Sequence, residues 1–112
     1  MRKIKMDIGA ALIKLKQNSL DQVEAWQKEL KARQDEAIET LKAEGVYVES
    51  WFYIQIEGQD YLLAYMRAND IAEAQKIGKN STFDIDQVHR KFKQNWIRSY
   101  PAKLLIDLDN SD

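Results

Sequence analysis

The stretch that most constrains the fold is the alternating segment VYVESWFYIQIEGQDYLLAYMR, residues 46–67. Its β-branched and aromatic residues, interrupted by one glycine, predict a β-hairpin. Side chains alternate across a strand, so the hairpin has two faces, and both carry mostly apolar side chains. A large apolar face is rarely left in water. The pattern therefore predicts helices on one face and a partner chain on the other.

We predict a tight turn at Gly58–Gln59, which pairs Ile56 with Tyr61 and Ser50 with Arg67. One face of the hairpin then holds Val46, Val48, Ser50, Phe52, Ile54, Ile56, Tyr61, Leu63, Tyr65 and Arg67. The opposite face holds Tyr47, Glu49, Trp51, Tyr53, Gln55, Leu62, Ala64 and Met66. We expect the second face to form a homodimer interface through Trp51, Tyr53, Leu62 and Met66.

The remaining periodic segments complete a recognisable order. They are a strand at Ala10–Lys16, a long helix at Leu20–Glu44 ended by Gly45, a short helix at Ile71–Ile77, a helix from Asp84 to about Arg98 and a strand at Ala102–Leu108. The order β-α-β-β-α(α)-β is the ferredoxin-like plan, an α+β fold with a four-stranded antiparallel sheet and helices on one face. We expect one domain over residues 1–112, with an extension at 1–9 and an acidic tail at 109–112.

Composition excludes several classes of function. The 17 Lys and Arg residues are balanced by 18 Asp and Glu residues, so nucleic-acid binding is not expected. The chain has no cysteine and one histidine, which excludes thiolate chemistry and a multi-histidine metal site within one chain. We expect no cofactor. The amino-terminal segment is neither a signal peptide nor long enough to span a membrane, so a cytoplasmic location is expected.

Three segments carry a resemblance to a known group of proteins. They are EGVYVESWF at 44–52, YLLAYMRAND at 61–70 and FDIDQVHRKF at 83–92. Over roughly residues 10–92 the chain resembles an uncharacterised bacterial family within the dimeric α/β-barrel superfamily. The resemblance implies two ferredoxin-like protomers packed sheet to sheet. It implies no particular chemistry, because the superfamily includes monooxygenases, mutarotases, haem-degrading enzymes and sensors.

Several polar residues occupy positions where apolar ones are expected. Arg33 falls on the apolar stripe of the long helix, and His89 on the inner side of the last helix. If the Ser50 face meets the helices, these residues converge with Tyr65, Arg67 and Ser50 on one pocket. In that hypothesis Arg33, Arg67 and Ser50 bind a small anion, with Glu49 alongside, and His89 or Tyr65 moves a proton. In the alternative, each group only satisfies a structural neighbour.

The aromatic residues allow two interpretations as well. These residues are Trp26, Trp51, Trp96, Tyr47, Tyr53 and Tyr65. They form either an aromatic ligand cage or ordinary core packing, and packing is the commoner role of aromatics at this spacing. Two functions follow and stay open at this point. One is a homodimeric small-molecule-binding protein, either catalytic without a cofactor or not catalytic, that takes a small anionic or aromatic ligand. The other is a binding, sensing or structural dimer module.

Overall fold

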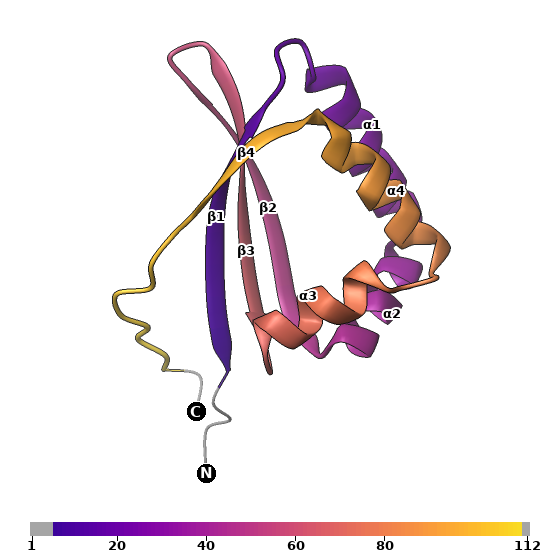
Figure 1. Ribbon diagram of the computed structural model, residues 1–112, viewed down its shortest axis with the longest axis vertical. Helices are drawn as coiled ribbons and strands as arrows, with labels where there is room; N and C mark the ends of the chain where they lie inside the picture. Colours follow the sequence, from indigo (N-terminus) through magenta and orange to yellow (C-terminus); the bar gives the residue numbers. More distant parts are fainter. Residues whose placement is uncertain (1–5, 111–112) are drawn as a thin grey trace.

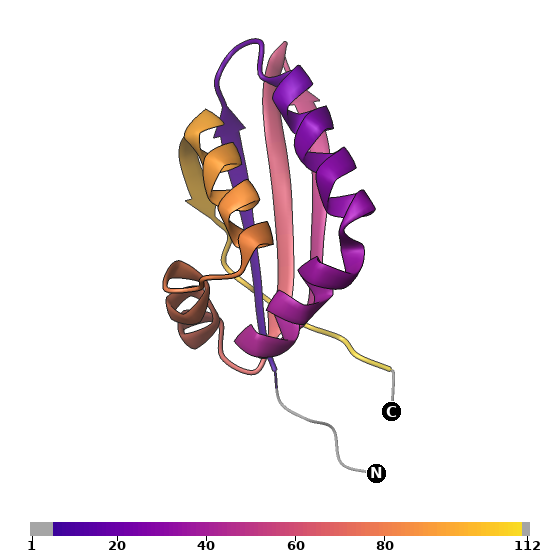
Figure 2. The ribbon, with the colours of Figure 1, turned by 90° about the vertical axis from the view of Figure 1, so that its right-hand side faces the viewer.

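The computed structural model describes residues 6–110 and confirms the ferredoxin-like fold. One antiparallel sheet has the strand order β2-β3-β1-β4, and the helices lie on one side of it (Figures 1 and 2). The elements are β1 (Asp7–Leu15), α1 (Leu20–Ala32), α2 (Gln34–Glu44), β2 (Val46–Ile56), β3 (Gln59–Ala68), α3 (Ile71–Lys79), α4 (Asp84–Phe92) and β4 (Trp96–Pro101). A short 3-10 turn, Lys93–Asn95, joins α4 to β4. In the part of the chain described, no helix is long and apolar enough to cross a membrane.

The hairpin forms, but its turn lies one residue earlier than predicted. Glu57 and Gly58 make the turn with φ values of +50° and +79°, so Ile56 pairs with Gln59 and Ser50 with Tyr65. Positive φ at both central residues is typical of the turn that matches strand twist. The predicted pairs were therefore wrong by two residues. Because side chains alternate with a period of two, that shift leaves the membership of the two faces unchanged, apart from Val46 beyond a bulge.

The prediction of which face of the hairpin meets the helices was wrong. Leu62 is 1% exposed in the core, and the Trp51 ring meets the Trp26 ring of α1 edge-on at 5.2 Å. The face expected to form the dimer interface, with Trp51, Tyr53, Leu62 and Met66, is therefore the inner face, which the chain's own helices cover. No helix among residues 6–110 covers the outer face, and its exposed apolar side chains are Val48, Phe52, Ile54, Ile56 and Leu63.

The predicted long helix is two helices that meet at Arg33. The backbone leaves the helical conformation there, with φ −117° and ψ 37°, and α2 then ends at Gly45 with φ +72°, the left-handed cap that was predicted. The break lets α2 bend, and Leu41 packs on a small core cluster around Val46 and Ala68. An unbroken helix would instead have carried the Arg33 guanidinium along its apolar stripe.

The ends of the sheet also differ from the prediction. The last helix stops at Phe92 instead of about Arg98, and the last strand is Trp96–Pro101 instead of Ala102–Leu108. The strand β4 lies at the edge of the sheet, where proline's missing N–H costs no ladder hydrogen bond, so Pro101 ends the strand without disrupting it. At the other end, β1 begins at Asp7, three residues before the predicted strand.

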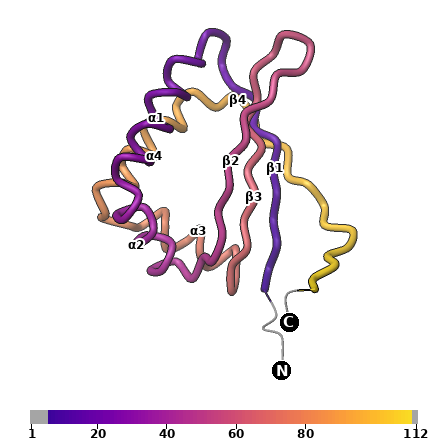
Figure 3. The backbone as a smooth tube through the Cα atoms, turned by 180° about the vertical axis from the view of Figure 1, so that it is seen from behind, coloured from indigo at the N-terminus to yellow at the C-terminus, as the bar shows by residue number. Residues whose placement is uncertain are grey.

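The main core lies between the inner face and the helices α1 and α4. It consists of Ile13, Leu15, Val23, Trp26, Leu62 and Phe92. Asp70 caps the first turn of α3, since its carboxylate accepts a hydrogen bond from the Glu73 N–H. Seen from behind, the helical layer bows away from the strands at mid-height (Figure 3). A cavity lies between these helices and the sheet.

Candidate functional site

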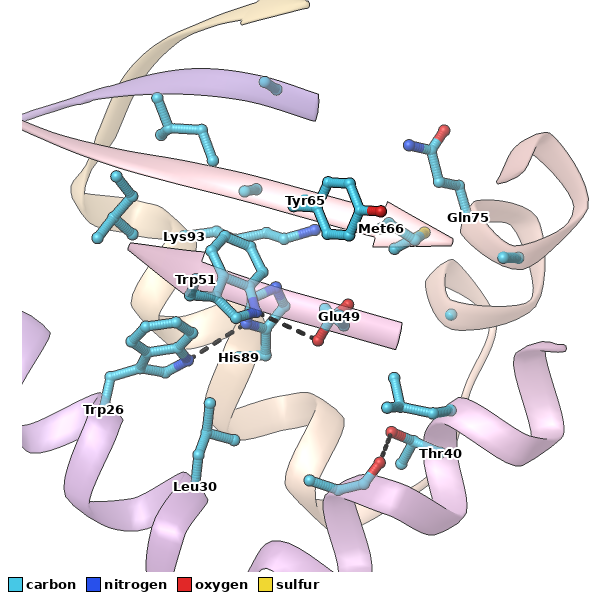
Figure 4. A pocket seen from close by; sticks show the side chains of 18 of the residues that line it. Trp26, Leu30, Thr40, Glu49, Trp51, Tyr65, Met66, Gln75, His89 and Lys93 are labelled. Carbon is cyan, nitrogen blue, oxygen red and sulfur yellow. Dashed lines mark hydrogen bonds between the residues drawn. The ribbon is translucent and has the colours of Figure 1, made fainter. Parts of the chain in front are cut away.

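A cavity of about 1300 Å³ lies between the inner face and the helices (Figure 4). Four aromatic rings form a continuous wall along it. Trp51 is at the centre, with ring centroids 5.2 Å from Trp26, 5.4 Å from His89 and 6.1 Å from Trp96. Trp26 also stacks on the core residue Phe92 at 4.4 Å. These aromatics therefore both pack the core and border the cavity, whereas Tyr47 is exposed on the hairpin.

His89 is held as a neutral side chain in this wall. The Trp26 Nε1–H donates a hydrogen bond of 3.3 Å to His89 Nδ1, which must then be an acceptor, so the histidine proton is on Nε2. Burial lowers the pKa of His89 to about 4, and the positive charge of Lys93 lowers it in the same direction. At neutral pH His89 is therefore an uncharged ring with one N–H.

Carboxylates from three elements lie along the same cavity. Trp51 Nε1–H donates a 3.2 Å hydrogen bond to Glu49 on β2, and Glu44 and Asp86 border the cavity from α2 and α4. Desolvation raises the pKa of Glu44 to about 7, with repulsion from Asp86 and Glu49 adding to it. Desolvation likewise raises the pKa of Glu49, although this side chain keeps surface open to the cavity. The acidic side of the cavity thus favours added protons or a positive group.

Two buried polar atoms of cavity residues have no hydrogen-bond partner among the described residues. They are the Trp96 Nε1–H, a donor, and Asp86 Oδ2, an acceptor. An unsatisfied buried group typically costs about 1–3 kcal/mol. Lys93, whose ammonium lies 5.3 Å from the Trp96 ring centroid, borders the cavity beside them. The Trp96 N–H can therefore donate to a bound molecule, and Asp86 Oδ2 can accept from one, if these side chains shift slightly.

Arg33 does not reach the cavity. Its guanidinium bonds Glu29 and Glu36 on either side of the helix break, at 3.1 and 2.7 Å, and Asp84 of α4 at 2.8 Å. The hydrogen bonds that Arg33 donates to these carboxylates raise the pKa of Arg33, and the bond to Glu36 has the largest effect. Arg33 thus joins α1, α2 and α4 from outside.

Arg67 and Ser50 belong to the outer face and do not border the cavity. Arg67 Nη2 bonds Asp107 Oδ1 at 2.9 Å, and Arg67 Nε donates to the Tyr65 hydroxyl. Tyr65 pairs with Ser50 and belongs to the same outer face. It is also among the residues that border the cavity (Figure 4), but its hydroxyl is engaged with Arg67. The predicted convergence was therefore wrong. His89 and Glu49 come together at the cavity, and Arg33, Arg67 and Ser50 do not join them.

Sequence reasoning missed Glu44 and Lys93 as residues that border the cavity, and it included Trp96 only among the aromatics of a possible ligand cage. Asp86, His89 and Lys93 are spaced by three and four residues, which places them on one side of a helix, and this spacing was the available signal. Trp96 was assigned to the helix because its position continues that series. Glu44 had no comparable signal, since the bend at Arg33 determines where the last turn of α2 lies relative to the sheet. Among residues 6–110, no three histidine or acidic side chains are grouped in a way that would hold a metal ion.

Comparisons with known proteins identify the fold and leave the chemistry open. A family model described as a family of unknown function, DUF6176, matches residues 6–111. No curated protein matches the chain. A solved structure, the crystal structure of a dimeric ferredoxin-like protein from an uncultured marine organism, is similar with a TM-score of 0.59 and 14% identity. The alignment covers 97% of this chain and 95% of that one, and at this identity it shows the fold alone.

Proposed function

Since the chain belongs to the family of unknown function DUF6176, we propose its function from the site itself: a homodimeric protein that binds a small aromatic molecule in the cavity between sheet and helices. The observation that carries the proposal is the wall of Trp26, Trp51, Trp96 and His89 along an open volume of about 1300 Å³. Ligand sites are typically concave and mostly apolar, with a few placed polar groups. A core that served packing alone would fill this volume.

Three carboxylates border the cavity, as do the basic residues Lys31, Lys79, Arg90 and Lys93. We base the choice of ligand on the carboxylates, which favour a molecule with a protonated amine or another strong hydrogen-bond donor. Glu49 projects from β2 beside Trp51, and Glu44 and Asp86 border the same space. A cation there would relieve the repulsion that raises the pKa of Glu44. The aromatic faces attract a cation as well. The two arginines that were predicted to bind an anion point elsewhere, so of the predicted anionic or aromatic ligands we retain the aromatic one.

We propose binding without catalysis. The Nδ1 atom of His89 accepts from Trp26, and the Tyr65 hydroxyl contacts Arg67, so both candidate proton carriers are engaged. With a pKa of about 4, His89 is neutral at pH 7 and cannot act as a general acid. Its Nε2–H is suited to donate a hydrogen bond to a ligand.

The homodimer is proposed on the outer face. Phe52 is 55% exposed there, and Val48, Ile54, Ile56 and Leu63 are exposed around it. A contiguous apolar face of this kind is unusual in a monomer. The similar solved structure is of a dimeric protein, which supports the same assembly. Light scattering at micromolar concentration should give twice 13.1 kDa, about 26 kDa, and a 13 kDa species would refute the dimer.

A charge-matched ligand panel tests the binding site. Benzylamine, benzyl alcohol and benzoate share one ring and differ in charge. We expect the amine to raise the melting temperature and quench tryptophan fluorescence more than the alcohol, with benzoate weakest, since stabilisation follows RT ln(1 + [L]/Kd). Glu49→Gln should remove the preference for the amine, whereas Glu24→Gln, on the exposed side of α1, should keep it. A preference for benzoate, or an equal response in both variants, would refute the proposed site.

A further inference from the structure

The segment after β4 is an extended apolar arm, which we define as residues 102–110. It leaves the sheet where Ala102 N–H donates to the Ala10 carbonyl at 2.9 Å, and it forms no helix or strand. It runs along the side of the sheet away from the helices and stands off from β1 (Figure 1). Three of its large side chains are more exposed than any apolar side chain of the outer face, at 86% for Leu105, 70% for Ile106 and 85% for Leu108, and Leu104 is 52% exposed.

A tether holds the arm over the outer face without burying it. Asp107 bonds Arg67 of β3 at 2.9 Å, and both side chains of this ion pair are less than one-third exposed. A segment that packed against its own sheet would bury its leucines, yet they remain in solvent. The arm is therefore positioned over the outer face, while its apolar side chains stay exposed in the part of the chain that the structure describes.

The arm and the outer face together match what a dimer interface needs. Four aliphatic side chains at these exposures present on the order of 500 Å², and a stable interface typically buries about 800 Å² from each partner. The exposed residues of the outer face, Phe52 among them, supply the remainder. Neither surface alone is of that size, whereas the two are adjacent and both apolar.

We infer that the arm packs against the outer sheet face of a second copy of this chain. This inference rests on the proposed homodimer and deepens it by adding the arm to the interface. In a two-fold dimer every contact is made twice, so each protomer's arm would cover the partner's outer face and be covered in return. The occupant is a second copy because the arm already lies beside the face that the proposed dimer uses.

A cross-linking experiment with introduced cysteines tests this placement. The natural chain has no cysteine, so Leu105→Cys in the arm and Phe52→Cys on the outer face are the only thiols in their variants. The two variants, one carrying a mass tag, are mixed and treated with a short bismaleimide. We expect a tagged–untagged covalent dimer. Lys28→Cys, on the exposed side of α1, replaces Phe52→Cys as the control and should give none.

The outcomes separate the arm from the dimer. A 26 kDa species by light scattering with no Leu105–Phe52 product refutes the arm placement and leaves the homodimer standing. A cross-link formed only within one chain, in a variant that carries both cysteines, also refutes it. A 13 kDa species refutes both proposals at once. Leu105→Ser with Leu108→Ser should weaken dimerisation at least tenfold without changing the circular dichroism, because both residues are exposed in the protomer, and Lys103→Ser should not.

Discussion

Replacing His89 with glutamine should change how the stability of this protein depends on pH. In the folded chain the pKa of His89 is about 4, because burial and then Lys93 disfavour the charged ring, and its ordinary value is 6.5. A depressed pKa means that the unfolded chain binds the proton more readily. His89 therefore contributes stability that is fully present above pH 6.5 and is lost as the pH falls from 6.5 toward 4.

The size of the effect follows from the two pKa values. Between pH 7 and pH 4 the linkage relation gives a loss of about 3 kcal/mol of unfolding free energy from His89 alone. Glu44 acts in the opposite direction over the same range. Its pKa is raised to about 7 from 4.5, so its contribution is present below pH 4.5 and is lost as the pH rises through 7. The two effects partly cancel in the natural protein, so only a comparison with a variant isolates His89.

The assay is urea unfolding at pH 4, 5, 6 and 7, followed by tryptophan fluorescence in the natural chain and in His89→Gln. Glutamine can still accept from the Trp26 N–H but does not titrate. The stability difference between the two proteins should move by about 3 kcal/mol in the variant's favour from pH 7 to pH 4. Because the chain has one histidine, its ring resonances in NMR report the same pKa directly. Parallel stability curves, or a histidine that titrates near 6.5, would refute the burial of His89 beside the cavity.

Three further substitutions have defined outcomes. Glu44→Gln should remove the part of the stability that declines as the pH rises through 7, which urea unfolding at pH 5 and 8 would detect; an unchanged slope would mean that Glu44 has an ordinary pKa. Arg33→Ala should lower the melting temperature more than Lys31→Ala does, and the difference should shrink in 1 M NaCl because salt screens the ion pairs with Glu29, Glu36 and Asp84; a salt-independent difference would argue against them. Gly45→Ala should cost about 1–2 kcal/mol by urea unfolding because its φ is +72°, and a neutral result would contradict the left-handed cap.

Alternation along the hairpin predicts which residues share a face, and it predicts nothing about which face meets the helices. The choice depends on β1, where Ile13 and Leu15 are buried while Lys14 lies between them. Ile13 pairs with Leu62, so Leu62 and its neighbours on that face must be inner. Lys14 marks the outer side of the same strand. If the pairing of β1 with the hairpin had been known, the alternation in β1 would have predicted which face of the hairpin meets the helices.

The bend at Arg33 was less accessible from sequence. The apolar spacing from Leu20 to Leu41 continues across Arg33 without a proline or glycine, so local patterns favour one helix. The backbone departs because Arg33 bonds three carboxylates, and one of them, Asp84, comes from a helix 51 positions later. A partner at that distance in sequence carries no local signal. Positions where one polar residue interrupts a stripe are nevertheless where a long predicted helix is best divided.

The arm shows how an exposed apolar segment can mislead a prediction made for one chain. AKLLIDL has the composition of a buried strand, and it was predicted as the last strand of the sheet. In the structure the edge position is taken by Trp96–Pro101, and the arm lies outside the sheet with its leucines exposed. Within one chain, the predicted burial of these residues is not found. In our proposal a second copy of the chain covers the arm. A pattern along one chain predicts that a segment is buried, but it does not specify whether the covering surface belongs to the same copy or to a partner.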